Sequence, residues 1–273
     1  MHGGSGRLKL PGGSVRFRID GPHGAPVLIL GHSLAVHLGL WDAQVAVWAR
    51  HFRVVRYDLP GHGGSAPPDG SCSIEGLGRQ ALALMDALAV RRAHWCGLSL
   101  GGMIGLWLMA NAPERIGHAV LAHTSAYLGA REIWDGRVLT AARRGMEPLV
   151  EPTLALWFTE QFRSEKPAAV EGVRRMIRET SVAGFQCGCT AIRDMDLRAR
   201  LAAIPHRVLV IVGRHDRGTP PDHGFAIADA IRGADRLALD TGHLGNTEQP
   251  EVFAHAVERF LMRSSLPDSG IAP

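Results

Sequence analysis

The sequence predicts an α/β protein in which helices cover a mostly parallel central sheet and a helical cap is inserted into the chain. Three observations support this prediction. Short β-rich runs alternate with helical patterns along much of the chain, as in parallel strands joined by helical crossovers. Several of these runs are apolar throughout, as expected of strands buried on both faces. The segment 125–202 breaks the alternation, because it has helical patterns and no convincing β run.

The candidate strands differ in their patterns. Residues 15–19 alternate apolar with basic side chains, whereas residues 26–30 are continuously apolar. The remaining segments complete the central set: 52–57, 94–98, 120–123, 207–212 and 236–239.

Two helices have clear sequence signals. Ser73 is a suitable N-cap for a helix that runs to about residue 90. Pro250 fits the first turn of a last helix, near residues 251–262. Helical spacing predicts that this last helix buries the following apolar side chains: Val252, Phe253, Val257 and Phe260.

These patterns divide the chain into a core and an insertion. We predict that residues 1–124 form the first part of the core, 125–202 the helical cap and 203–264 the second part of the core. Residues 265–273 are expected to be a disordered tail.

Composition indicates an ordinary globular enzyme. The 273 residues carry a formal charge of +4 with a pI near 9.2, but the basic residues are scattered, which argues against a nucleic-acid partner. No apolar run is long enough for a membrane span or a signal peptide, so we expect a cytoplasmic protein without a membrane partner. Because the four cysteines lack zinc-ligand spacing, we interpret them as reduced thiols: Cys72, Cys96, Cys187 and Cys189.

Residues 97–101 carry the strongest chemical signal. They read Gly-Leu-Ser-Leu-Gly, directly after an apolar strand and before a helical pattern. This arrangement places a serine on a sharp strand-to-helix turn, where small glycines relieve crowding and the hydroxyl is exposed. The motif predicts an α/β-hydrolase fold with Ser99 as nucleophile.

A nucleophilic serine needs a histidine base and an acid that orients the histidine, in the chain order serine, acid, histidine. Asp216 follows the strand 207–212 in a loop, where the acid is needed. Asp222 and Asp194 compete for this role, but Asp222 fits better as a helix-capping residue. His243 lies in a turn before the last helix and is the predicted base.

The tetrahedral intermediate of acyl transfer needs backbone donors for its oxyanion. One donor is the N–H of Leu100, which follows the nucleophile. The second is assigned to Leu34 N–H, in the loop after the strand 26–30.

Here the chain resembles the 3-oxoadipate enol-lactonase family. The resemblance rests on these segments: residues 31–34, 56–58, 61–63, 96–102, 157–159, 191–194 and 242–250. It implies serine-dependent hydrolysis of an enol-lactone in the β-ketoadipate route of aromatic catabolism, through an acyl-enzyme. His32 and Ala35 stand where family members often have Asn and Gly, which leaves the exact substrate open.

The resemblance also implies how substrate is bound. Arg137 or Arg193 would pair with the carboxylate of a small anionic lactone or ester, and Trp134 and Trp157 would contact it. No metal and no organic cofactor are needed. The alternatives are a general carboxylesterase, a C–C bond hydrolase, a cofactor-free perhydrolase and, outside enzymes, a hydrolase-like ligand receptor. Oligomeric state and cap mobility are not predicted.

Overall fold

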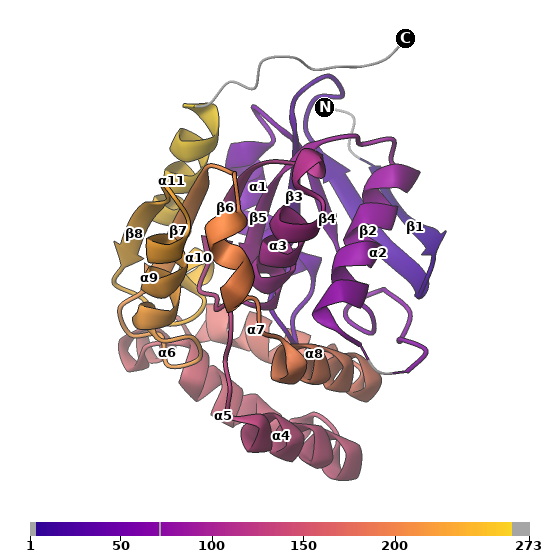
Figure 1. The fold of residues 1–273 in the computed structure, drawn as a ribbon. Helices are drawn as coiled ribbons and strands as arrows, with labels where there is room; N and C mark the ends of the chain where they lie inside the picture. Colours follow the sequence, from indigo (N-terminus) through magenta and orange to yellow (C-terminus); the bar gives the residue numbers. More distant parts are fainter. Residues whose placement is uncertain (1–3, 71, 264–273) are drawn as a thin grey trace.

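The computed structural model describes residues 4–70 and 72–263, and within these residues eight strands form one sheet in the order β1-β2-β4-β3-β5-β6-β7-β8 (Figure 1). The strands are β1 (Gly4–Leu10), β2 (Gly13–Asp20), β3 (Val27–Gly31), β4 (Arg53–Tyr57), β5 (Ala93–Leu98), β6 (Ile116–Ala122), β7 (Val208–Gly213) and β8 (Asp235–Leu239). All neighbours from β4 to β8 are parallel, and β2 is antiparallel to both β1 and β4. The predicted α/β class with a mostly parallel sheet is confirmed.

Helices cover both faces of the sheet. The α-helices are α1 (Asp42–Trp48), α2 (Ile74–Ala87), α3 (Leu100–Asn111), α4 (Arg131–Arg144), α5 (Glu147–Trp157), α6 (Glu160–Glu165), α7 (Pro167–Glu179), α8 (Val182–Asp194), α9 (Pro221–Ala230), α10 (Gly245–Glu248) and α11 (Pro250–Met262), and the 3₁₀ helices are η1 (Leu38–Trp41), η2 (Pro113–Arg115) and η3 (Arg198–Ala203). Helices α2, α3 and α9 lie in front of the sheet in Figure 1, and α1 and α11 pack together behind it. None of the described helices is long and apolar enough to cross a membrane.

Helices α4–α8 follow β6 and precede β7, and we call them the inserted helices. They form a layer at the bottom of Figure 1. A Cβ at Gly188 of α8 would meet the side chains of Leu34 and Leu100, which follow β3 and β5. The inserted helices therefore lie against the carboxyl ends of the central strands.

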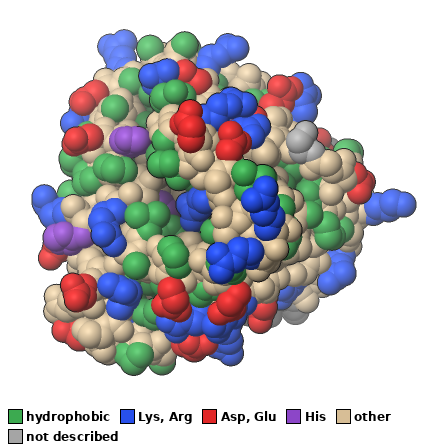
Figure 2. Space-filling view, turned by 90° about the horizontal axis from the view of Figure 1, so that it is seen from below, with side chains coloured by type: hydrophobic (Ala, Val, Ile, Leu, Met, Phe, Trp, Pro, Cys, Tyr) green, Lys and Arg blue, Asp and Glu red, His purple; other side chains and the backbone are tan. Residues whose placement is uncertain are grey.

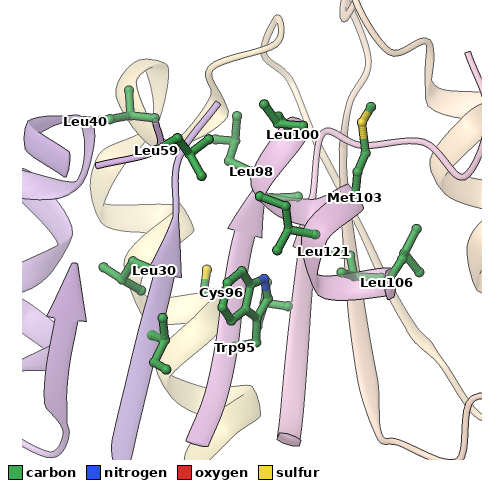
Figure 3. Close-up of a cluster of buried hydrophobic side chains, with 14 of the residues drawn as sticks. Leu30, Leu40, Leu59, Trp95, Cys96, Leu98, Leu100, Met103, Leu106 and Leu121 are labelled. Carbon is green, nitrogen blue, oxygen red and sulfur yellow. The ribbon is translucent and has the colours of Figure 1, made fainter. Parts of the chain in front are cut away.

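The core is built around the middle strands. Figure 3 shows buried side chains of β3, β5, β6 and α3, among them Leu30, Trp95 and Leu121. Trp95 also donates from Nε1 to the carbonyl oxygen of Gly101, at 3.0 Å. The core thereby fixes the start of α3 on the end of β5.

Local signals explain the element ends. Ser73 caps α2, because its hydroxyl accepts a hydrogen bond from Gly76 N–H at 3.1 Å, as predicted. Pro250 begins α11, also as predicted. Within α11, however, Val252 is 53% exposed, so the prediction that it is buried is wrong. Phe253 next to it faces the core instead.

Two further predictions need correction. Strand β1 was not predicted, because its glycines and its mostly exposed side chains give no apolar run. Cys72 and Cys187 form a disulfide, so the interpretation as reduced thiols is wrong for this pair, whereas Cys96 and Cys189 are free and buried. The disulfide joins the segment before α2 to α8. The predicted tail, residues 265–273, lies outside the described residues.

Candidate active site

Ser99 occupies the sharp turn between β5 and α3. Its backbone has φ +56° and ψ −115°, a conformation that non-glycine residues rarely adopt. Its N–H donates to Ala122 O at 2.9 Å, and the Thr124 hydroxyl donates to Ser99 O at 2.7 Å. A Cβ at Gly101 would overlap the carbonyl of Gly31, so only glycine lets this turn pack against the end of β3. The turn thus presents Ser99 at the N-terminal end of α3.

Asp216 and His243 form a hydrogen-bonded pair. His243 Nδ1 lies 2.9 Å from Asp216 Oδ2. Asp216 Oδ1 accepts from the N–H groups of Gly218 at 2.8 Å and Thr219 at 2.9 Å, and Oδ2 also accepts from the Thr219 hydroxyl at 2.8 Å. These bonds fix the carboxylate in one orientation, and His243 presents its other nitrogen, Nε2, away from it.

The Asp216 carboxyl is buried, with 3% of the residue exposed. Burial alone raises the pKa of Asp216, but the charge of His243 and hydrogen bonding by His123 and His243 outweigh burial and hold this pKa well below its usual range. Asp216 is therefore ionised wherever the protein is folded at ordinary pH.

Trp157 supports His243 in two ways. The two rings stack with centroids 5.7 Å apart and an interplanar angle of 30°. The Trp157 carbonyl accepts a hydrogen bond from His243 N–H at 2.7 Å. Trp157, which the resemblance implies as a substrate contact, is thus a support for the histidine at the end of α5.

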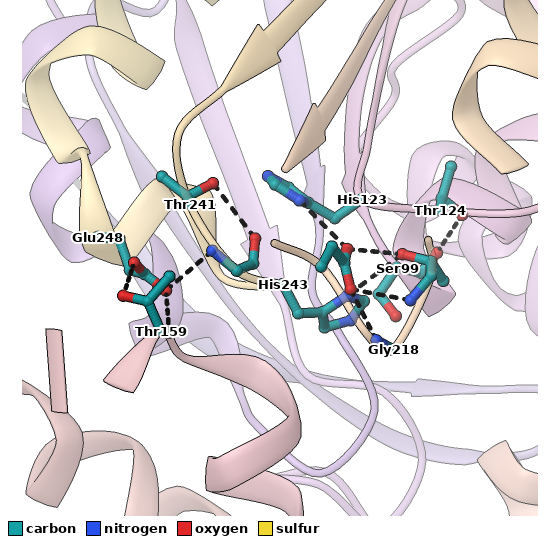
Figure 4. A network of polar contacts seen from close by, with 11 residues as sticks. Ser99, His123, Thr124, Thr159, Gly218, Thr241, His243 and Glu248 are labelled. Atoms are coloured by element: carbon teal, nitrogen blue, oxygen red, sulfur yellow. Dashed lines mark hydrogen bonds and ion pairs between the residues drawn. The ribbon is translucent and has the colours of Figure 1, made fainter. Parts of the chain in front are cut away.

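Glu248 connects the histidine loop to the inserted helices, and this network is drawn in Figure 4. Glu248 Oε1 accepts from the N–H groups of Gly242 and Thr159, each at 3.1 Å, and Oε2 accepts from the Thr159 hydroxyl at 2.9 Å. Thr159 lies between α5 and α6 and also caps α6. One carboxylate therefore fixes the loop before His243 against the layer that covers it.

The loop after β3 carries the predicted oxyanion donor Leu34. The side chains of Leu34 and Leu100 both lie beneath Gly188 of α8, so the structure brings these two residues together. His32 Nε2 accepts from Leu59 N–H at 2.9 Å, and His62 Nε2 accepts from Ala35 N–H at 3.1 Å. Two imidazoles thereby hold the loop on either side of Leu34.

Both of these histidines must be neutral to accept such bonds. Burial lowers the pKa of His32 to about 3 and the pKa of His62 to about 3. Each donates from Nδ1 to a backbone carbonyl, that of Ser33 at 2.7 Å and of Pro60 at 2.9 Å. The loop is therefore held by uncharged groups, and His62 has a structural role through its bond to Ala35.

Arg137 and Trp134 lie together on α4. The guanidinium carbon of Arg137 is 5.4 Å from the centroid of Trp134 and 5.8 Å from that of Phe185, and Nη2 donates to the Thr153 hydroxyl at 3.1 Å. The residue is half-buried, and burial lowers the pKa of its guanidinium. Within residues 4–70 and 72–263, no carboxylate forms an ion pair with Arg137. Most of its donors are therefore available to a ligand.

Arg193 has a different environment. Its guanidinium binds Asp135 at 2.6 Å and Asp194 at 2.7 Å, which joins α8 to α4. Asp194, one of the two competitors for the role of catalytic acid, is also paired with Arg131 at 2.8 Å. Figure 2 shows the face of the inserted helices, where basic and acidic side chains are interspersed in this way. Arg137 and Arg193 are equal candidates for carboxylate binding in the sequence. The structure distinguishes them, because only Arg193 is paired with carboxylates among the described residues.

The strand ends bring the site residues together. Ser99, Asp216 and His243 follow the parallel strands β5, β7 and β8, so they share one edge of the sheet. Asp222 lies in the first turn of α9 and is exposed, away from this arrangement. Among the described residues, Ser99 Oγ has no hydrogen-bond partner, as is common before a substrate binds.

Two residues near the site have no role predicted from the sequence. His123 follows β6, and Glu248 belongs to the segment 242–250. A polar residue at the carboxyl end of a buried apolar strand is a signal that applies to His123.

A serine on a strand-to-helix turn, with an acid and a histidine after later strands of the same sheet, defines the class of α/β hydrolases. The alpha/beta hydrolase fold family matches residues 26–250, and the chain belongs to it. Within that family it belongs with the 3-oxoadipate enol-lactonases and is a hydrolase.

The chain is similar in sequence and structure to several known hydrolases. The chain is 34% identical to 3-oxoadipate enol-lactonase 2 of Acinetobacter baylyi, over 92% of this chain and 94% of that one. The enol-lactonase structure from Burkholderia xenovorans LB400 is 37% identical with a TM-score of 0.92, covering 94% of this chain and 100% of that one. A hydrolase structure from Pseudomonas aeruginosa PA01 is 42% identical with a TM-score of 0.92, covering 94% and 98% of the two chains.

Proposed function

We propose that this protein hydrolyses 3-oxoadipate enol-lactone to 3-oxoadipate through an acyl-enzyme on Ser99, as a step in aromatic-compound catabolism. Family membership supports a lactone as substrate, and the hydrogen-bonded pair of Asp216 and His243 supports the serine mechanism. The small-molecule substrate is an anion, since lactonisation consumes only one of the two carboxyl groups of the product.

In the first half of the reaction, Ser99 Oγ attacks the lactone carbonyl while His243 Nε2 takes the hydroxyl proton. Asp216 stabilises the resulting imidazolium through Nδ1. The N–H groups of Leu34 and Leu100 donate to the oxyanion, and one such donor typically contributes about 3 kcal/mol to transition-state stabilisation.

The intermediate then collapses to the acyl-enzyme. The ring C–O bond breaks, and the imidazolium of His243 returns its proton to the enol oxygen, which converts to the ketone of the product. Water attacks the acyl-enzyme with His243 again as base, and Ser99 is regenerated. The enol is a good leaving group, so ring opening is easy.

The observation that carries the assignment to an anionic lactone is the guanidinium of Arg137, which has no carboxylate partner among the described residues and donates to the Thr153 hydroxyl. A partly buried cation without a carboxylate partner is costly unless a ligand pairs with it. Trp134 beside it offers an apolar face for the lactone ring. Arg193 is already bound by two carboxylates, so we assign carboxylate recognition to Arg137.

Steady-state kinetics of Arg137→Met and Arg193→Met test this assignment on two substrates. Arg137→Met should lower kcat/KM for the enol-lactone by about 10-fold to 100-fold, because a charge-assisted hydrogen bond to the substrate is lost. Hydrolysis of p-nitrophenyl acetate, which is neutral, should hardly change. Arg193→Met is the matched control and should leave both activities near those of the wild type.

A loss of both activities in Arg137→Met would indicate a folding defect, which urea unfolding detects. Two other outcomes would contradict the proposal. A selective loss in Arg193→Met transfers the role to that residue. A wild type that hydrolyses p-nitrophenyl acetate and ignores enol-lactones is a general esterase.

A further inference from the structure

His123 lies beside the catalytic pair at the end of β6. Its Nδ1 is 3.4 Å from Asp216 Oδ2, the oxygen that also bonds to His243 Nδ1 (Figure 4). We propose that His123 is a positioning residue that shares the Asp216 carboxylate with His243 and thereby sets the basicity of His243. This inference rests on the proposed role of His243 as the base.

The buried position and backbone conformation of His123 destabilise the fold, which is expected only if the residue has a functional role. The residue is 1% exposed, its Nε2 has no hydrogen-bond partner within the described part of the chain, and the contact that Nδ1 makes with Asp216 Oδ2 is a long one of 3.4 Å. Its φ of +47° is also unusual for a residue other than glycine. Buried unpartnered polar groups and strained backbone both destabilise a fold, and both concentrate at functional sites.

The neighbouring backbone leaves space for this imidazole. A Cβ at Gly245 would overlap Nε2 of His123, and a Cβ at Gly213 would lie 3.1 Å from its Cε1. The His123 and His243 rings meet edge to face, with centroids 6.1 Å apart. The ring is thereby held with Nδ1 toward Asp216.

Chemistry determines which atom carries the proton. His123 Nδ1 faces a carboxylate oxygen, so it must carry the proton. An unprotonated Nδ1 would present its lone pair to the negatively charged oxygen and be repelled. The charged groups that face the pair are Asp216, from the loop after β7, and Glu248, from α10. Burial lowers the pKa of His123, so its ring stays neutral.

The expected effect follows from competition at Oδ2. The N–H of His123 donates to the same carboxylate oxygen as His243, and the hydrogen bond between that oxygen and His243 is therefore weaker. Without this N–H, Asp216 stabilises the His243 imidazolium more strongly. A neutral His243 is needed for attack by Ser99, and activity should then be lost at a higher pH.

The test is the pH dependence of Ser99 labelling by a fluorophosphonate probe, which needs no natural substrate. In His123→Leu, the acid limb of the labelling rate should move up by about half a pH unit or more. His123→Asn keeps an N–H at the position of Nδ1 and should restore the wild-type limb. His94→Asn, which replaces a buried histidine at the other end of the sheet, is the control and should leave the limb unmoved.

Failure of the inference and failure of the proposed function give different results. A wild type that is not labelled at Ser99 contradicts the serine mechanism itself. Normal labelling with the same acid limb in His123→Leu makes His123 merely structural. Should His123→Leu not fold, ¹⁵N spectra of wild-type histidines decide instead: a neutral Nδ1–H tautomer for His123 supports the inference, and an Nε2–H tautomer overturns it.

Discussion

At the scale of single residues, Asp216 differs from the other acidic residues near the site in its partners. Both of its oxygens accept hydrogen bonds within its own loop, and one of them also bonds to His243. Asp222 is exposed and Asp194 is paired with arginines. Geometry therefore favours Asp216 as the acid that orients the base.

Asp216→Asn should lower kcat by about 10⁴-fold, because an amide cannot hold His243 in the Nδ1–H tautomer. Labelling of Ser99 by a fluorophosphonate should slow in parallel. Asp222→Asn is the matched control and should retain nearly full activity, while Ser99→Ala should abolish labelling. If Asp222→Asn were the inactive variant, the acid would have to be reassigned.

At the scale of elements, the histidine loop is fixed to the junction of α5 and α6. Glu248 makes two hydrogen bonds to Thr159 at this junction and one to the N–H of Gly242 in the histidine loop. The Trp157 carbonyl adds a bond to His243 N–H. The orientation of His243, the proposed base, thus depends on the inserted helices as well as on the core.

Glu248→Ala should reduce kcat by about 10-fold or more and destabilise the fold by roughly 1–3 kcal/mol, because it leaves buried donors without an acceptor. Glu248→Gln retains an acceptor for the two N–H groups and should keep most of the activity. Glu251→Ala, at an exposed site in the first turn of α11, is the control. Kinetics and urea unfolding measure both effects, and unchanged kcat in Glu248→Ala would refute the coupling.

At the scale of the whole molecule, several buried histidines are kept neutral by the fold. Burial lowers the pKa of His32 and of His62 to about 3 and the pKa of His94 to about 4. In the unfolded chain each would titrate near 6.5. Between these values the unfolded state binds more protons, so the fold loses stability as the pH falls.

We therefore expect the free energy of unfolding to fall between pH 6.5 and pH 4, by up to roughly 1.4 kcal/mol per pH unit for each such histidine. The depressed pKa of Asp216 acts in the same direction only below about pH 4, where the carboxyl of the unfolded chain takes up a proton. Urea unfolding from pH 8 to pH 4 measures the slope. His94→Asn should make the slope shallower, and a flat profile from pH 7 to pH 5 would contradict the prediction.

What the sequence predicts well depends on local chemistry. The strand and turn around Ser99 were predictable, because an apolar run and closely spaced glycines have one common structural explanation. The end of β6 was less predictable from the sequence. The predicted strand, 120–123, includes His123, whereas β6 ends at Ala122 in the structure. Positive φ at a non-glycine residue has no sequence signal.

Long-range pairing was not predictable. Cys72 and Cys187 are 115 residues apart, and nothing in their spacing indicates a bond. Arg137 and Arg193 look alike in sequence, because only the fold shows that Asp135 and Asp194 pair with one of them. Such choices depend on which helix faces lie together.

The disulfide has a consequence for the time scale of ligand entry. It attaches α8 to the core covalently, and Glu248 attaches the junction of α5 and α6 at a second point. Together with the chain connections to β6 and β7, these attachments restrict swinging of the layer as one rigid body, a motion that would take microseconds to milliseconds. We expect passage to be limited by side-chain and loop rearrangements between the two attachments, on the order of nanoseconds to microseconds.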